Sequence, residues 1–476
     1  MKIKVHIKLY KFINSILIIG IVIIIFLCSR MIENKIIEKI WLEKLVLILY
    51  FLIFIESLLV NGLLSLNTLF ISTYGLFTFG GIFVKVFFGI QYESINNSLG
   101  INLDDNLIME TLYINTVFLI AYWLGSKLKI NKEYSSIKVK ENVNLYNTGK
   151  LLMFLSLPAQ LIRYYFEISY VSNAGVLIYL LGSRSIPVPI VIRIFSIVFH
   201  AGFCLIYTSM PSKKMFIKFS LLYTLTLTPS FLLGMRSQFV LTVIFVLWLA
   251  KIRGDIFIKK SAIIIFAGIL IIFMQILGTV RFGGTFESIP IGMIFLNFIK
   301  NQSMSFYVLP LYIKYKPNIL YQSYPFILDS FISWLFPSGQ SLAVLKSGRS
   351  SLGHQLMYTI SPDYYLSGAS LGTSMIAELY EFGYIGVFLG GLFYPVFINI
   401  FNKYCKEKRV ILYFALVIVQ AIVFAPRASY FPGIYNIIRY GIVYSFVILI
   451  CNSILKKKSI IYFIMSRDSW TGIKTN

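Results

Sequence analysis

Three arginines beside helix-breaking residues are the side chains of this sequence best suited to chemistry on an anionic ligand. They stand in the segments Gly-Met-Arg236, Arg281-Phe-Gly-Gly and Pro-Arg427, with no acidic residue within one helical turn in sequence. A guanidinium is planar, binds phosphate through two parallel hydrogen bonds and keeps its charge when partly buried. We therefore expect Arg236, Arg281 and Arg427 to bind a di-anionic or poly-anionic head group.

Few titratable residues could move a proton. His354 follows Ser-Leu-Gly, and an imidazole transfers protons well near neutral pH, although a histidine in a loop can also be merely solvated. Glu378 and Glu381 are one helical turn apart and are surrounded by glycines. Either the glycines serve close helix packing, or the two carboxylates pair with an outer arginine. The pair Asp104 and Asp105 resembles the acidic pair of metal-using glycosyltransferases, but we interpret it as surface charge.

The composition places these residues in a membrane protein. Of 476 residues, 58% are hydrophobic and 13% are charged, with a mean hydropathy of +0.80. One soluble core stops growing near roughly 250–300 residues, so this much apolar sequence excludes a cytosolic enzyme, a secreted disulfide scaffold and a disordered regulator. The net charge of +24 would indicate nucleic-acid binding in a soluble chain, but in a membrane chain it reflects basic cytoplasmic loops, and we predict no nucleic-acid partner.

A helix that crosses the bilayer needs roughly 20 mostly apolar residues. With that window the sequence predicts an all-α, polytopic protein of about twelve spans in one membrane domain over residues 1–476. The predicted spans are 12–29, 45–64, 67–90, 109–127, 150–170, 188–209, 216–233, 237–250, 261–280, 372–400, 410–426 and 436–455.

Basic residues gather in six segments that fall on one side of this arrangement, which places both termini in the cytoplasm. Only eight of the 31 lysines lie on the outer half, but nine of the twelve arginines do. Those nine are Arg30, Arg163, Arg184, Arg193, Arg236, Arg281, Arg349, Arg427 and Arg439. Orientation signals do not distinguish the two bases, so the outer arginines indicate an anionic ligand outside. Arg163 is the exception, because Glu167 one turn later predicts a structural ion pair.

Residues 281–371 form the one long outer loop, inserted between the ninth and tenth predicted spans. Its many aromatic residues and low net charge argue against disorder. Aromatic side chains here either anchor an interfacial lid or stack on sugar rings, and both uses can hold for different residues. Residues 326–336 are long enough for a helix in the interface plane.

Other motifs are missing from the sequence. The four cysteines lie in or near spans, which indicates neither a disulfide framework nor a thiolate metal site, and no Walker, HExxH or dinucleotide fingerprint occurs. We therefore predict no metal and no cofactor. His200 lies in the middle of a span, where we expect a neighbouring helix to satisfy its imidazole.

Two stretches resemble the Wzy-type O-antigen polymerases. Residues 353–362, Gly-His354-Gln-Leu-Met-Tyr358-Thr-Ile-Ser-Pro, run into 368–386, Gly-Ala-Ser-Leu-Gly-Thr-Ser-Met-Ile-Ala-Glu378-Leu-Tyr-Glu-Phe-Gly-Tyr-Ile-Gly. This is similar to the family's histidine-bearing outer loop followed by G-x-G-x-S-x-I-A-E-x-Y-x-x-F-G-x-x-G, with Ser370 in place of the first glycine of the Gly-x-Gly pair. The Gly-Met-Arg236 step is also similar to that family. The motif resemblance covers residues 230–440.

The resemblance implies a helical membrane glycosyltransferase of GT-C-like type that works without a metal in the bacterial inner membrane. Such polymerases move a growing glycan from undecaprenyl pyrophosphate onto the next lipid-linked repeat unit at the outer leaflet. His354 would then be the general base, with Arg236 and Arg281 on the leaving pyrophosphate and Glu378 orienting a catalytic group. The predicted substrate-binding residues are Arg427, Arg439, Arg184, Arg349 and Tyr358.

Two other functions fit the same topology. An O-antigen ligase would share the arginines and the loop histidine but would use a lipid A-core acceptor. A flippase for lipid-linked oligosaccharides would have a similar number of spans but needs no long outer loop. Expected partners are lipid-linked oligosaccharides, the bilayer, and a chain-length regulator and flippase of the same pathway.

Overall fold

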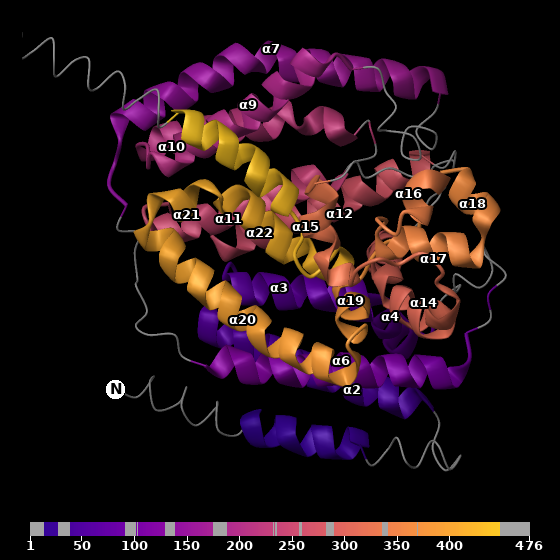
Figure 1. Cartoon of the computed structure of the whole chain (residues 1–476). Coiled ribbons are helices and arrows are strands. Elements are labelled where there is room, and N and C mark those ends of the chain that lie inside the picture. Colours follow the sequence, from indigo (N-terminus) through magenta and orange to yellow (C-terminus); the bar gives the residue numbers. More distant parts are fainter. Residues whose placement is uncertain are drawn as a thin grey trace, which may run out of the picture.

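The computed structural model describes residues 14–26, 39–90, 101, 103–128, 139–174, 188–231, 233, 236–256, 259–281, 290–335, 341–368 and 370–447. Every regular element in these ranges is a helix, which confirms the all-α class. The long helices run side by side across the view in Figure 1, and the short helices α14, α16, α17 and α18 gather at its right-hand end.

The following helices overlap predicted spans, and they differ in length. They are Asn14–Phe26, α2 (Lys39–Asn61), α6 (Asp105–Lys127), α7 (Val143–Ala174), α9 (Ile190–Thr208), α10 (Lys213–Thr226), α11 (Arg236–Arg253), α12 (Lys260–Arg281), α20 (Gly383–Glu407), α22 (Ala415–Phe424) and 434–447. Within the described ranges, four helices have the length and apolar composition to cross a membrane: Leu66–Phe88, Asp105–Lys127, Ile190–Thr208 and Gly383–Glu407. The total of about twelve spans and the GT-C-like architecture stay predictions.

Two of the predicted spans differ in detail from the structure. The span at 67–90 consists of α3 (Leu66–Tyr74), a π-helical turn η1 (Gly75–Phe79) and α4 (Gly80–Phe88). The start of the tenth span at residue 372 is wrong, because α20 begins at Gly383. That glycine has a φ of 67°, a left-handed conformation that ends the preceding short helix, so the apolar run is broken where hydropathy is continuous.

Close backbone contacts at glycine hold the long helices together. A Cβ on Gly125 of α6 would lie 2.1 Å from the Leu392 carbonyl oxygen of α20, and one on Gly202 of α9 would lie 2.8 Å from the Met153 nitrogen of α7. Lipid tails are as apolar as the side chains they contact, so helices in a membrane associate through such close packing.

The ends of the long helices that were predicted to face the cytoplasm are linked by polar contacts. Each contact joins a basic side chain to a carbonyl of another predicted inner segment. They are Lys251 to Asn61 (3.1 Å), Arg253 to Pro211 (2.9 Å) and Arg409 to Lys140 (2.7 Å). The basic segments between residues 127 and 409, in the part of the chain that the structure describes, therefore lie at one end of the bundle.

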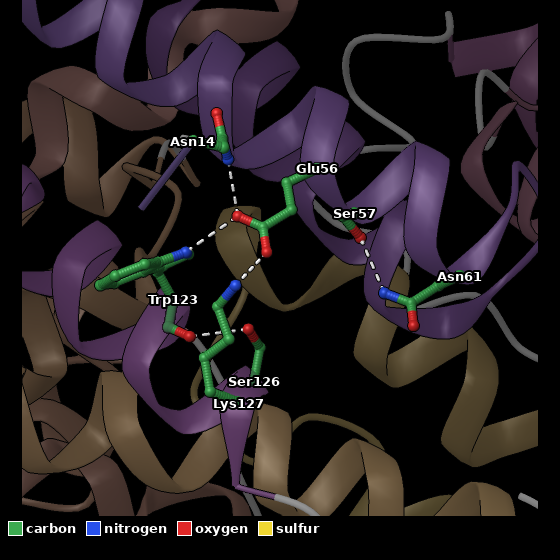
Figure 2. A network of polar contacts seen from close by, with 7 residues as sticks. All are labelled: Asn14, Glu56, Ser57, Asn61, Trp123, Ser126 and Lys127. Atoms are coloured by element: carbon green, nitrogen blue, oxygen red, sulfur yellow. Dashed lines mark hydrogen bonds and ion pairs between the residues drawn. The ribbon is translucent and has the colours of Figure 1, made fainter. Parts of the chain in front are cut away.

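A buried carboxylate joins the first helix to this end. Glu56 of α2 accepts hydrogen bonds from Asn14 (2.7 Å) and the Trp123 indole (3.0 Å), and it pairs with Lys127 (Figure 2). The Glu56 side chain is almost fully buried, whereas Lys127 is about one-third exposed. Three helices thus share one ion pair and its hydrogen bonds.

The opposite end of the bundle is built from short helices. They are α13 (Ile291–Gln302), η4 (Ser303–Tyr307), α14 (Val308–Tyr315), η5 (Lys316–Asn318), η6 (Phe326–Leu328), α15 (Asp329–Leu335), α16 (Leu342–Lys346), α17 (Leu352–Ile360), α18 (Pro362–Leu366), α19 (Met375–Tyr380) and η7 (Ala425–Arg427). Phe306, Leu311 and Tyr312 are buried, so the described part of the predicted outer loop has a core of its own.

Candidate functional site

Three interrupted helices meet around Arg427. The π-helical turn η1 packs against the 3₁₀ turns η4 and η7, which come from distant parts of the chain. Arg427, the last residue of η7, donates from Nη1 to Oε1 of Gln302 (2.5 Å), and its guanidinium lies 5.6 Å from the centre of the Phe77 ring. Non-α-helical backbone at membrane depth occurs where it is buried in protein or lines a cavity, and π turns are frequent at functional sites.

Glu378 fixes the chain that follows Arg427. Its side chain is 2% exposed, accepts the Tyr430 backbone N–H at Oε2 (2.9 Å) and accepts the Thr373 hydroxyl at Oε1 (3.0 Å). Burial raises the pKa of the Glu378 carboxyl from 4.5 to about 8, and the two hydrogen bonds oppose part of that rise. The expected pairing with an outer arginine is wrong within the described residues, where the partners of Glu378 are a backbone amide and a hydroxyl.

Glu381 ties α19 to the outer short helices. It accepts from the Phe326 backbone N–H (2.7 Å) and from the Gln322 side-chain amide. Burial raises the pKa of Glu381, and Lys316 opposes that rise. Glu381 therefore also has partners other than arginine in the described part of the chain.

His354 and Tyr358 lie on α17, one turn apart. Both pack edge-on against the buried ring of Tyr365, at centroid distances of 6.0 Å and 5.6 Å. Gly353 lets α17 approach the strand-like segment before α19, since a Cβ there would lie 1.9 Å from the Leu371 carbonyl oxygen. The histidine is thus held beside the segment that carries Thr373 and leads to Glu378.

The other predicted arginines are distributed around and beyond this region. Arg236 is the first residue of α11 and Arg281 the last of α12, so both stand where a helix ends. Arg349 is exposed and lies within electrostatic range of the Tyr324 hydroxyl. Arg184 falls outside the described residues.

Arg439 belongs to a different cluster. It lies on the helix at 434–447 with its guanidinium 3.5 Å from the centre of the Tyr435 ring, within electrostatic range of Arg163. Arg163 pairs with Glu167 (2.8 Å), which confirms the predicted ion pair, and it also donates to Ser196 (3.0 Å).

His200 is satisfied by a neighbouring helix, as predicted. Its Nδ1 lies 2.7 Å from the hydroxyl of Tyr223 on α10. Asp105 pairs with Lys39, and its side chain is 74% exposed. Cys204 and Cys405 are buried free thiols, and no group of three metal-ligating side chains occurs among the described residues.

Several residues of this region were not identified from the sequence. Gln302 is an uncharged polar residue with no motif around it, and Thr373 lies within the 368–386 motif but was given no role from the sequence. Tyr430 contributes a backbone N–H that no residue type encodes. The one usable signal was the interruption of apolar runs by Ser, Asn and Gln near 302–305.

Comparisons with known proteins identify the family. The family model described as O-antigen polysaccharide polymerase Wzy matches residues 10–458. No curated protein and no solved structure matches the chain significantly.

Proposed function

The chain belongs to the Wzy family of O-antigen polysaccharide polymerases, and from this premise we propose its substrate and the roles of its residues. The substrates are oligosaccharide repeat units carried on undecaprenyl pyrophosphate, joined at the outer leaflet of the bacterial inner membrane. Both termini lie in the cytoplasm, and a flippase and a chain-length regulator of the same pathway act beside the protein.

The observation that carries the proposal is the position of Arg427. Its guanidinium stands at the junction of η1, η4 and η7, where it donates to Gln302 and faces the ring of Phe77. A guanidinium is a permanently charged fork of N–H donors whose geometry matches a phosphate, so its position at this junction suits an anionic leaving group. Glu378 acts on this arginine as a positioning residue, because its carboxyl accepts the backbone N–H of Tyr430, three residues after Arg427.

The reaction needs charge neutralisation on one side and a base on the other. An acceptor hydroxyl oxygen attacks the anomeric carbon of the donor glycan, the bond from that carbon to the pyrophosphate oxygen breaks, and its electron pair leaves with the pyrophosphate. His354 takes the hydroxyl proton. Arg427, with Arg236 from the start of α11 and Arg281 from the end of α12, neutralises the charge that develops on the leaving group, so the step proceeds without a metal.

Glycan binding falls to the outer short helices. Tyr358 is half-buried beside His354 and packs edge-on against the buried Tyr365, so its own ring offers an apolar surface with a polar rim that suits a sugar ring. Arg349 is exposed at the same end and binds the hydroxyl or acidic groups of the glycan. We assign the same role to Arg184.

A genetic complementation experiment tests this function. Deletion of the gene should leave a single repeat unit on the lipid core in a gel of the surface glycan, whereas loss of a ligase or flippase leaves none. Plasmid-borne R427Q and H354A should reproduce the deletion phenotype. R409Q, which removes an arginine from the opposite end of the bundle, should restore long chains.

The outcomes separate the function from the site. Normal chain lengths after deletion would refute the polymerase function, and a complete loss of surface glycan would indicate a ligase or flippase. If R427Q and H354A both polymerise normally at wild-type expression levels, the function stands and the site assignment is wrong.

A further inference from the structure

We propose that residues 322–331 of the outer loop, the outer strap, position Arg427, and that Glu381 anchors the strap for this purpose. The inference rests on the proposed function, in which Arg427 neutralises the leaving pyrophosphate. Glu381 is then a second positioning residue, which acts on the arginine through the strap, whereas Glu378 holds the turn after the arginine directly.

Glu381 holds the first half of the outer strap. Its carboxylate accepts the Phe326 backbone N–H (2.7 Å) at one oxygen and the Gln322 side-chain amide at the other. The Phe326 side chain is 1% exposed, so the strap is embedded in the core of the outer short helices at this point. Within the strap, the Tyr324 hydroxyl donates to Asp329 (3.2 Å). The first half of the strap is therefore braced and fixed to the junction of α19 and α20.

The other half of the outer strap contacts the turn that follows Arg427. The hydroxyls of Ser330 and Ser429 lie 2.8 Å apart, within hydrogen-bond distance. The rings of Phe331 and Phe431 pack edge-on at a centroid distance of 5.4 Å. Ser429 is buried, and a buried hydroxyl is normally hydrogen-bonded, so its contact with the strap is part of what stabilises the turn.

These contacts form a closed network of three segments. α19 carries two glutamates one turn apart: Glu378 accepts the Tyr430 backbone N–H, and Glu381 holds the strap. The strap returns to the same turn at Ser429, and the short turns η6 and η7 both pack against α19. The turn after Arg427 is therefore held at Tyr430 by Glu378 and at the two flanking residues by the strap.

Irregular backbone makes these contacts important for Arg427. Between η7 and the helix at 434–447 the chain is not helical, so it lacks the repeating hydrogen bonds that hold a helix rigid. A residue that binds a reacting group has to be held within about 0.5 Å of its productive position. The strap and Glu378 therefore supply rigidity that the local backbone does not.

Hydrogen–deuterium exchange of the purified full-length protein in detergent tests the network without relying on activity. E381A removes the anchor of the strap and leaves Glu378 in place. It should speed the exchange of backbone amides at 322–331 and also at 428–431 by at least about tenfold, the change expected from loss of a charged hydrogen bond. E381Q keeps an oxygen for the Phe326 N–H and should lie between E381A and the wild type. D363N removes an exposed carboxylate from α18 and should exchange as the wild type does.

A second variant interrupts the network at its other contact. S330A removes one hydroxyl from the strap and leaves the Glu381 anchor intact. It should speed exchange at 428–431 and leave exchange at 322–326 unchanged. Because the change is small, S330A keeps the test decisive if E381A does not accumulate as folded protein.

Polymerisation kinetics with lipid-linked repeat units show whether the network acts through Arg427. E381A should lower kcat by about tenfold with little change in KM, because orientation of the arginine matters most when charge develops on the leaving group. R427K keeps the charge but not the fork, so its lower activity should depend less on accurate orientation. E381A should therefore lower kcat much less in the R427K background than in the wild type, whereas a structural defect unrelated to Arg427 would lower it by the same factor in both.

The outcomes separate this inference from the proposed function. Unchanged exchange at 428–431 in E381A and S330A would overturn the inference and leave the function standing. An equal loss of kcat from E381A in the two backgrounds would also overturn it. A wild type that does not extend lipid-linked repeat units would refute the proposed function, and the exchange rates would still decide whether the strap holds the turn.

Discussion

The isosteric change Glu378→Gln tests whether the buried carboxyl of α19 is neutral in the folded protein. The pKa of this group rises from 4.5 to about 8 because the side chain is buried. Between these two values the folded state keeps a proton that the unfolded state loses, so the free energy of unfolding falls as the pH rises from 4.5 to 8. The full shift corresponds to about 5 kcal/mol at pH 9, as an upper bound.

Glutamine removes this dependence without disturbing the packing. Its carbonyl can accept the Tyr430 N–H, and its amide can donate to the Thr373 hydroxyl. E378Q and the wild type should therefore be equally stable at pH 5, and E378Q should be the more stable at pH 9. For a chain of this size, a change of 1 kcal/mol in the free energy of unfolding shifts the melting temperature by about 1 °C. The melting temperature of E378Q at pH 9 should therefore exceed that of the wild type by up to about 5 °C.

Thermal unfolding in one detergent, at fixed protein concentration from pH 5 to pH 9, measures the difference. D105N is the matched control for removal of a carboxylate, because Asp105 is mostly exposed. A pH-independent difference between E378Q and the wild type, or an E378Q that is less stable at pH 9, would refute the reasoning. Retained polymerisation by E378Q would agree with a positioning role.

Three further changes probe the packing. G353A should unfold at a lower temperature than the wild type or fail to accumulate, because its Cβ would lie 1.9 Å from the Leu371 carbonyl oxygen; wild-type yield and melting temperature would contradict this contact. G125A should likewise separate α6 from α20, because its Cβ would lie 2.1 Å from the Leu392 carbonyl oxygen. Chemical crosslinking between these two helices, with a reagent that does not depend on disulfides, should then give less crosslinked product than in the wild type. K127M should destabilise the protein by less than the roughly 3–5 kcal/mol typical of a broken buried ion pair, because Lys127 is partly exposed. The double variant K127M/E56Q should recover stability. If it does not, the loss of the ion pair is not the cause of the destabilisation.

Local spacing was enough to predict some contacts of this protein. Arg163 and Glu167 are four residues apart on one helix, so their pairing follows from helical geometry alone. Basic loops likewise predicted which helix ends lie together, because the positive-inside bias acts on each loop separately.

The environment of Glu378 could not be predicted in the same way. One of its partners is a backbone N–H 52 residues later in sequence, and backbone donors have no residue signature. The junction at Arg427 was equally hidden, because Gln302 is 125 residues away and the turns η1 and η4 carry no charged residue. Hydropathy also predicted one continuous span across Gly383, since a left-handed glycine changes the direction of the chain without changing its polarity.

The π-helical turn at Gly75–Phe79 also sets the phase of the helix that follows it. Each residue advances an α-helix by about 100°, so the extra residue of a π turn rotates all of α4 by that angle relative to α3. This rotation brings Lys85 to Glu43 (2.8 Å) and places Gly80 against the Ile299 carbonyl, where a Cβ would lie 2.7 Å away. Deletion of one residue in this turn would therefore disrupt both contacts together, although neither lies within it, and would be more harmful than most substitutions there.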